Sequence, residues 1–373
     1  MRIVAVVGTR PEAIKVAPVV REARARGIET LVCATAQHRE MLDQVLDLFE
    51  LEADSDLDLM QPGQTLAALS ARALTALDEV IDRVRPDWLL VQGDTTTAMI
   101  AAMVGFYRRV QVGHIEAGLR TGDLERPFPE EFNRRVADTI SAAHFVPTPS
   151  ARDNLLGEGF SPDTLHLTGN TVVDALQWML SRDGDALSEL AAVLPPPDAR
   201  MVLVTAHRRE SFGDGMREIA AALRQVAQAN PDVHFVYPVH PNPEVREVME
   251  AELAGQDRIA LLPPLPYQAF VQLMARAELI LSDSGGVQEE APSLGVPALV
   301  MRETTERPEA VEAGAVRLVG VRADTIVPAA NELLSDPDLH ARMARAINPY
   351  GDGLAAQRIV AILAGTPWEP FGC

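Results

Sequence analysis

The segment 279–290, Leu-Ile-Leu-Ser-Asp-Ser-Gly-Gly-Val-Gln-Glu-Glu, joins a short apolar run to a glycine turn and then to a helix pattern. Glycines let the backbone approach a ligand closely, and the free N–H groups at the helix start attract anions. An acidic side chain one turn into such a helix can hydrogen-bond a ribose. The segment therefore predicts a nucleotide diphosphate at the carboxyl end of a strand. An ordinary tight turn is the alternative, because short glycine motifs give many false matches.

Apolar strand-like runs alternate with helical patterns on both sides of this segment. Continuous apolar strands separated by helices imply parallel sheets that are covered on both faces. Two such sheets in 373 residues predict an α/β protein of two Rossmann-like, doubly wound domains that face each other across a cleft. The strand-like runs lie at 3–7, 30–34, 88–91, 110–115, 201–205, 233–239, 259–262, 279–281 and 298–301.

The boundary between the two domains is predicted near Gly169-Asn170. This gives a first domain over 1–169 and a second over 170–354. The run Pro195–Pro197 has the clearest linker composition, but it also fits a loop before the next strand. The C-terminal segment 355–373 contains a helical pattern that we expect to pack back onto the first domain.

Composition and charge exclude several classes of protein. A chain with 47% hydrophobic and 23% charged residues is globular in composition. No apolar run approaches the roughly 20 residues of a membrane span, and a secretory signal is not expected before the first strand. The two cysteines, Cys33 and Cys373, give neither a disulfide framework nor metal spacing, so a reducing cytoplasm is expected.

The net charge of −20 argues against nucleic-acid binding, which needs a basic face. A phosphorylated substrate would also be repelled, so its site must concentrate cations locally. Arg10 and Lys15 flank the helix start that follows the first strand, with Pro11 suited to the first helical position. Both cations could reach a phosphate there. The alternative is a well-capped helix start with two solvated cations.

Three carboxylates follow three successive segment ends in the first half. Asp94 comes after the strand at 88–91, at the end where doubly wound folds bind ligands. Glu116 follows the next strand, and Glu130 starts a helix after two prolines. Taken singly, Asp94 could be a helix N-cap, Glu116 a salt-bridge partner of Arg120, and Glu130 a complement to the helix dipole. Together they could converge on one ligand.

The second half supplies candidates for the other part of a nucleotide ligand. His207 follows the strand at 201–205 and titrates near neutrality, so it could stabilise a departing phosphate or relay a proton. A structural histidine is the alternative. Phe270 lies in an aromatic segment that could stack on a base, although core packing is the commoner fate of such residues. No His/Glu grouping has metal-ligand spacing, and there is no Gly-x-Ser-x-Gly nucleophile pattern.

Read in order, these motifs closely resemble the non-hydrolysing UDP-N-acetylglucosamine 2-epimerases of bacteria. The resemblance implies two Rossmann-like domains with the active site between them, the GT-B-like architecture that glycosyltransferases share. It also implies a cytoplasmic homodimer that serves cell-surface polysaccharide synthesis. The matching segments are 8–18, 36–44, 93–97, 116–121, 207–213, 283–294 and 304–309.

The activity implied is reversible inversion at C2 of UDP-GlcNAc to give UDP-ManNAc, through elimination and re-addition of UDP. The intermediate would be 2-acetamidoglucal, and no cofactor is required. By matching position, Asp94, Glu116 and Glu130 would transfer protons and stabilise the oxocarbenium, with His207 near the departing diphosphate. The positions that match substrate-binding residues are Arg10, Lys15, Phe270, Ser284, Gly285, Gly286 and Glu290.

The resemblance also implies an activator site for a second molecule of UDP-GlcNAc. The matching positions are Gln37, His38, Gln64, Glu130, Arg208 and His240.

Two other functions compete with the epimerase. A UDP-sugar glycosyltransferase would need an acceptor site, and no acceptor-binding or membrane-facing stretch stands out. A nucleotide-sugar sensor would keep the diphosphate turn but has no use for three converging acids.

Overall fold

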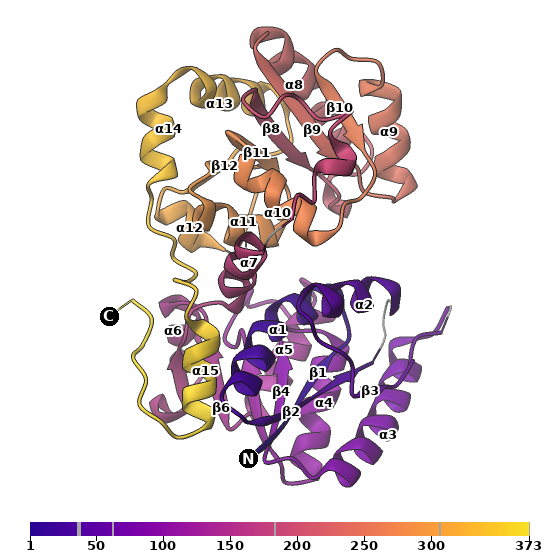
Figure 1. The fold of residues 1–373 in the computed structure, drawn as a ribbon, viewed down its shortest axis with the longest axis vertical. Coiled ribbons are helices and arrows are strands. Elements are labelled where there is room, and N and C mark those ends of the chain that lie inside the picture. Colours follow the sequence, from indigo (N-terminus) through magenta and orange to yellow (C-terminus); the bar gives the residue numbers. More distant parts are fainter. Residues whose placement is uncertain (36–38, 62, 183, 306, 373) are drawn as a thin grey trace. The chain divides into compact units, whose positions relative to one another are not determined.

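The computed structural model describes residues 1–35, 39–61, 63–182, 184–305 and 307–372. The chain forms two compact units, one of Met1–Trp178 with Tyr350–Cys373 and the other of Met179–Pro349. Each unit is a parallel sheet with helices packed against it, which confirms the predicted α/β, GT-B-like fold class (Figure 1). Within the described residues, no helix has both the length and the apolarity to cross a membrane.

The first unit contains a seven-stranded sheet in the order β3-β2-β1-β4-β5-β6-β7. Its central strands are mainly apolar, and the residues Ile3–Val7 are at most 1% exposed. Helices α1, α2 and α15 pack together, and so do α3, α4 and α5. The strands are β1 (Arg2–Val7), β2 (Glu29–Ala34), β3 (Ser55–Asp56), β4 (Trp88–Gln92), β5 (Gln111–Ile115), β6 (Ala143–Val146) and β7 (Leu165–Leu167).

Helices α1 to α6 connect successive parallel strands, whereas α7 follows the last strand and α15 lies near the C-terminus. The helices of this unit are α1 (Arg10–Ala25), α2 (Arg39–Leu48), α3 (Leu66–Val84), α4 (Thr96–Tyr107), α5 (Glu130–Ile140), α6 (Pro149–Gly157), α7 (Thr171–Ser181) and α15 (Ala355–Leu363), with the short 3-10 helix η1 (Pro162–Thr164). Helix α4 is buried along most of its length because it lies between α3, α5 and the sheet.

The second unit contains a six-stranded sheet in the order β10-β9-β8-β11-β12-β13, with a core of its own around Val202, Leu223 and Phe235. Its strands are β8 (Arg200–Thr205), β9 (Val233–Pro238), β10 (Ile259–Leu262), β11 (Leu279–Ser282), β12 (Ala298–Val300) and β13 (Val316–Leu318). Its helices are α8 (Asp214–Ala229), α9 (Pro243–Leu253), α10 (Tyr267–Arg276), α11 (Gly285–Glu290), α12 (Pro308–Glu312), α13 (Ala323–Ser335) and α14 (Pro337–Ala344), with 3-10 turns η2 (Ser188–Leu190), η3 (Arg209–Ser211) and η4 (Ala291–Leu294).

Each sheet has one point at which the strand order reverses. In the first unit β1 pairs with β2 on one side and with β4 on the other, so the chain builds the sheet outward from β1 in both directions. In the second unit β8 stands between β9 and β11 in the same way. In open α/β sheets, ligands bind beyond the carboxyl ends of the strands at such a switch point. Each unit therefore offers one expected ligand position.

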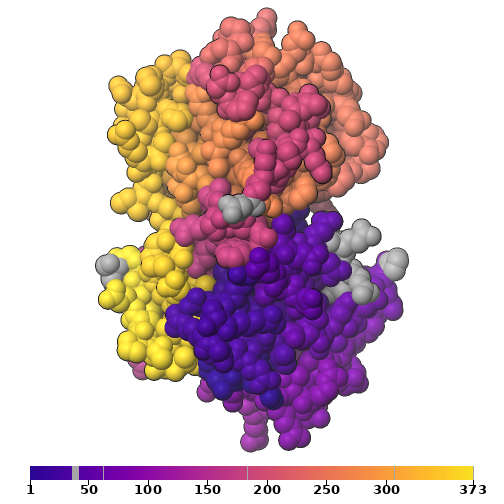
Figure 2. Space-filling view, in the orientation of Figure 1, coloured from indigo at the N-terminus to yellow at the C-terminus, as the bar shows by residue number. Residues whose placement is uncertain are grey.

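The C-terminal segment belongs to the first unit. Helix α15 packs on α1, and the space-filling view shows the yellow C-terminal residues lying against the indigo surface of the N-terminal region (Figure 2). The carboxylate of Asp174 on α7 accepts hydrogen bonds from the backbone N–H groups of Ala355 and Ala356. Because α7 is tied to the C-terminal segment in this way, the division between the units falls at Trp178 rather than at Gly169-Asn170.

Candidate active site

Asp94 lies in the turn that follows β4, at the switch point of the first sheet. The preceding Gly93 has a φ of 69°, a left-handed conformation that favours glycine, and its N–H donates to the Ile115 carbonyl at 3.0 Å. The Asp94 carbonyl accepts from Asn133 at 2.9 Å, and its carboxylate accepts from the Arg134 guanidinium at 2.5 Å. The carboxylate keeps 31% of its surface exposed. It is thus fixed in direction and still accessible.

Glu116 follows β5, the strand next to β4, and is held more deeply. Its φ is 65°, which is uncommon for a residue with a Cβ, and its side chain is 8% exposed. The carboxylate forms an ion pair with the Lys15 ammonium and accepts a hydrogen bond from Asn170 at 2.9 Å. The alternative salt bridge to Arg120 is wrong, because that guanidinium pairs with other carboxylates. Lys15, which was predicted to lie near a phosphate, forms this ion pair with Glu116.

Glu130 is the first residue of α5 and is partly exposed. Residues three and four positions apart share a helix face, so Glu130 shares the face of Asn133 and Arg134, which both contact Asp94. The next residue, Glu131, is fully buried and accepts from the N–H groups of Thr121 and Gly122. Glu131 therefore holds the loop at Thr121 and Gly122 in place, whereas Glu130 lies on the side of the helix that faces Asp94.

Glu12 is a fourth carboxylate at the switch point, and the sequence analysis did not select it. Its side chain is 2% exposed, accepts from the Gly8 N–H at 3.0 Å and accepts from the Thr95 hydroxyl at 2.6 Å. Burial raises the pKa of Glu12, although these hydrogen bonds oppose the shift. Glu12 joins the loop after β1, which carries the half-buried Arg10, to the loop that carries Asp94.

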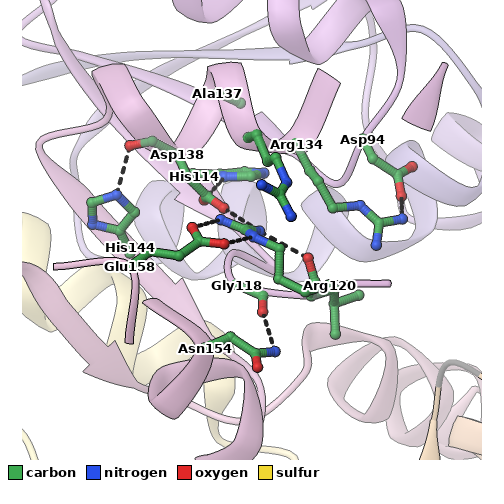
Figure 3. A network of polar contacts seen from close by, with 12 residues as sticks. Asp94, His114, Gly118, Arg120, Arg134, Ala137, Asp138, His144, Asn154 and Glu158 are labelled. Atoms are coloured by element: carbon green, nitrogen blue, oxygen red, sulfur yellow. Dashed lines mark hydrogen bonds and ion pairs between the residues drawn. The ribbon is translucent and has the colours of Figure 1, made fainter. Parts of the chain in front are cut away.

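A buried polar network lies behind the Asp94 loop (Figure 3). The His114 ring is fully buried, with Nδ1 at 2.6 Å from the Asp138 carboxylate and Nε2 at 2.7 Å from the Gly93 carbonyl. Asp138 also pairs with Arg120 at 2.8 Å, and Arg120 in turn binds Glu158 through two contacts of 2.8 Å. The sequence analysis missed this network, since its partners come from three separate segments.

His207 lies at the switch point of the second sheet, after β8. The buried Asp283 carboxylate, which follows β11, accepts from the backbone N–H groups of His207 and Arg208 at 2.7 and 2.8 Å, and it lies 3.2 Å from His207 Nδ1. The exposed His240 ring stacks on His207 with centroids 5.4 Å apart. Burial lowers the pKa of His207; Asp283 opposes this shift, whereas Arg208 and His240 reinforce it.

The glycine turn at the start of α11 is bordered by a cation. A Cβ at Gly285 would lie 2.7 Å from the Arg307 guanidinium, so glycine leaves room for that group. Arg307 is itself fixed by Glu289, at 2.6 Å. The Ser284 N–H donates to the Ser282 hydroxyl at 3.0 Å. The turn thus combines a helix N-terminus with a positive charge.

Two other predicted residues lie near this turn in the second unit. Glu290 is 5% exposed, and its carboxylate accepts from the Tyr267 hydroxyl at 2.7 Å. Phe270 lies one turn along α10 from Tyr267 and is partly exposed. Tyr267 is therefore packed in the unit, whereas Phe270 keeps a face available to a ligand.

The similarity of the whole chain to known proteins is extensive. The family model described as UDP-N-acetylglucosamine 2-epimerase matches residues 21–364. The chain belongs to this epimerase family. The resemblance that the sequence motifs indicated is thereby confirmed.

Similar epimerases cover the chain almost end to end. The UDP-N-acetylglucosamine 2-epimerases of Escherichia coli strain K12 and Yersinia pestis are each 52% identical over 369 residues, covering 97% of this chain and 98% of theirs. The solved structure of the Neisseria meningitidis UDP-GlcNAc 2-epimerase, bound to UDP-GlcNAc, is 44% identical with a TM-score of 0.92, covering 98% of this chain and 100% of that one.

The residues predicted to form an activator site belong to both units. Gln64 donates to the Met60 sulfur at 2.7 Å in the first unit, while Arg208 and His240 belong to the second. Gln37 and His38 lie outside the described residues.

Among the described residues, no group of three or more His, Cys, Asp or Glu side chains is arranged to hold a metal ion. A signal for several of the missed residues was present in the sequence: Glu12, His114 and Asp283 lie within or beside quoted motifs. Their roles depend on partners that only the fold brings close.

Proposed function

We propose that this protein interconverts UDP-GlcNAc and UDP-ManNAc by inverting C2, through elimination and re-addition of UDP. The observation that carries the proposal is the pair of fixed carboxylates, Asp94 and Glu116, at the ends of neighbouring strands in the first unit. The Gly93 N–H bonded to the Ile115 carbonyl brings these two strand ends together. Membership of the epimerase family supplies the substrate class.

The chemistry explains why several carboxylates are needed. The C2 proton of the sugar is not adjacent to a carbonyl carbon, so direct removal is difficult. Breaking the C1–O bond first, with the electron pair leaving on UDP, develops oxocarbenium character at C1 and acidifies the C2–H. A carboxylate then takes that proton, and a C1–C2 double bond forms to give 2-acetamidoglucal. Re-addition of UDP at C1, with protonation of C2 from the opposite face, gives the epimer.

In this mechanism the first unit acts on the sugar ring. Asp94, Glu116 and Glu130 form the group that moves the C2 proton and stabilises the positive charge at C1. The Lys15 ammonium lies against the Glu116 carboxylate, and the Arg134 guanidinium lies against that of Asp94. Such preorganised charges stabilise a transition state without reorganisation at the moment of reaction.

The second unit binds the nucleotide and the leaving group. The Ser284-Gly285-Gly286 turn and Arg307 would hold the diphosphate, Glu290 the ribose hydroxyls and Phe270 the uracil. His207 would stabilise the departing diphosphate, and Arg10 of the first unit would help to neutralise it. The cations are needed because the net charge of −20 repels a diphosphate.

The family resemblance supports two further parts of the proposal. A second UDP-GlcNAc would act as an activator at Gln37, His38, Gln64, Glu130, Arg208 and His240. The protein would work as a homodimer.

The test is incubation with UDP-GlcNAc in deuterated water, followed by NMR of the sugar. We expect UDP-ManNAc with deuterium at C2, because the removed proton exchanges with solvent before the opposite face is protonated. Small amounts of free UDP and 2-acetamidoglucal should accumulate. A product in which C2 keeps its proton while the sugar has moved to an acceptor would instead identify a UDP-sugar glycosyltransferase.

An Asp94→Asn variant tests the carboxylate assignment in the same assay. Asn keeps the size of the side chain but cannot take a proton, so we expect kcat to fall by about a thousandfold while UDP still binds. Asp163→Asn, at an exposed carboxylate in η1, is the matched control and should retain wild-type turnover. Near-normal turnover of Asp94→Asn would remove Asp94 from the mechanism.

A further inference from the structure

We propose that His114 is a positioning residue for Asp94, and that it acts as a permanently protonated imidazolium that holds the Gly93 carbonyl. The positioning effect on catalysis rests on the proposed function, since it requires Asp94 to act on the sugar. The charge state and the hydrogen bond to Gly93 stand on the geometry of the first unit alone.

The contacts of the ring determine its protonation state. Nε2 lies 2.7 Å from a backbone carbonyl, which can only accept a hydrogen bond, so Nε2 must carry a proton. Nδ1 lies 2.6 Å from the Asp138 carboxylate, and one of these two atoms must also carry a proton. The Arg120 guanidinium, 2.8 Å from the other Asp138 oxygen, favours the ionised carboxylate. The second proton therefore resides on Nδ1, and the ring is cationic.

The charged groups around His114 balance one another. Asp138 comes from α5, Arg120 from the loop after β5 and Glu158 from the end of α6, so the set contains two cations and two anions, of which Glu158 alone is exposed. Burial by itself lowers the pKa of His114, but Asp138 and the Gly93 carbonyl more than offset this, and the pKa is raised. The pKa of Asp138 is lowered: burial opposes the shift, and His114 and Arg120 outweigh it.

This arrangement fixes the main chain immediately before Asp94. Gly93 donates its N–H to the Ile115 carbonyl and accepts from His114 through its own carbonyl, so both of its polar groups are bound. Helix α5 then supplies Asp138 to hold His114, and Asn133 and Arg134 to hold Asp94 itself (Figure 3). His114 thus connects the helix that orients the carboxylate to the turn that presents it.

His144 provides a matched comparison. It pairs in register with His114 on the neighbouring strand β6 and is 1% exposed. Its ring nitrogens face the Asp138 and Thr164 carbonyls at 2.8 and 3.2 Å, and burial lowers its pKa. The shorter contact, at 2.8 Å, places the single ring proton of His144 on Nε2. The longer contact at Nδ1 does not hold a second proton, because burial disfavours the charged ring and no carboxylate is among these hydrogen-bond partners, so His144 is expected to be neutral.

The charge state is tested on the wild-type protein by ¹⁵N NMR of histidine-labelled samples at pH 8.5. Among the eight histidines, we expect one ring to keep both nitrogens protonated while the exposed rings are neutral. The signature should persist in His144→Gln and vanish in His114→Gln. A spectrum of the wild type without any imidazolium at this pH would overturn the proposal, even if the variants failed to fold.

The positioning role is tested by steady-state kinetics of the same variants. We expect His114→Gln to lower kcat by about a hundredfold with KM within about twofold, because a small misplacement of a catalytic group costs rate more than binding. His144→Gln should keep kcat within about threefold. Unchanged kcat in a folded His114→Gln would overturn the positioning role. If the wild type itself did not epimerise UDP-GlcNAc, the proposed function would fail, while the NMR result would still decide the charge of His114.

Discussion

Lys15 and Glu116 show how the neighbours of a residue decide its role. Both side chains are almost buried, at 10% and 8% exposure, and each offsets the charge of the other. Removing one partner of a buried ion pair leaves a charge without compensation in a medium of low polarity. Breaking this buried ion pair should therefore destabilise the fold more than removing a solvent-exposed lysine would.

We predict that Lys15→Met lowers the free energy of unfolding by about 3–5 kcal/mol, measured by urea denaturation. The double variant Lys15→Met/Glu116→Gln should regain part of this stability, because it no longer buries an unpaired carboxylate. It should remain inactive, because the Glu116 carboxylate is lost. Arg26→Met, which breaks a partly exposed pair with Glu22 at the end of the same helix, should cost no more than about 1 kcal/mol. Equal losses for the two single variants would contradict a buried pair.

The connection between α7 and α15 is the main new feature at the scale of elements. Asp174 caps the start of α15 from a helix that lies far away in the sequence. Burial raises the pKa of Asp174 to about 7, although the two backbone N–H groups oppose this shift. At a pH between the pKa of this carboxyl in the unfolded chain and its pKa in the folded protein, the folded protein keeps the carboxyl protonated, whereas the unfolded chain has lost the proton.

This shift predicts a pH dependence of stability with a definite sign. Between the ordinary pKa of an aspartate, 3.8, and about 7 the folded state holds the extra proton, so stability falls as pH rises, by at most about 1.4 kcal/mol per pH unit. Asp174→Asn should lack this contribution while keeping an oxygen that caps α15. Urea unfolding from pH 5 to 8 measures the difference, with Asp163→Asn as the control. Parallel profiles for wild type and Asp174→Asn would show that Asp174 does not titrate in this range.

Four short strands, β3, β6, β7 and β13, were not predicted from the sequence patterns. They have only two to four residues, as do the predicted β10, β11 and β12, but each contains a polar residue in its short run, such as His144 in β6 and His166 in β7. A run of that length interrupted by a polar residue does not differ from a loop by composition. Such strands form because an existing sheet edge offers their backbone groups hydrogen-bond partners.

At the scale of the whole molecule, the two units are built on the same plan. Each places its candidate residues beyond the strands at its switch point, after β1, β4 and β5 in the first unit and after β8 and β11 in the second. The proposal assigns the nucleotide to the second unit and the sugar ring to the first.

The assignment of the nucleotide to the second unit predicts which part of the chain UDP stabilises and protects from hydrogen–deuterium exchange. UDP at a hundred times its Kd should raise the free energy of unfolding of the unit that binds it by about 2.7 kcal/mol. In hydrogen–deuterium exchange, protection should concentrate in the second unit, at the turn of α11 and the loop after β8. Glu290→Gln should weaken both effects. Glu252→Gln, at a carboxylate paired with Arg224 in the same unit, is the control. Protection confined to the first unit would contradict the assignment.

The sequence by itself determined the fold class, because alternating apolar strands and amphipathic helices leave few ways to bury both faces of a parallel sheet. It also predicted which loops carry the candidate site residues, since the motifs follow the strands directly. The tertiary structure decided the partners within those loops. Lys15 and Glu116 are 101 residues apart, and His114 and Asp138 are 24 apart. Such pairs form because strand order places distant segments side by side, and local spacing along the chain carries no record of that order.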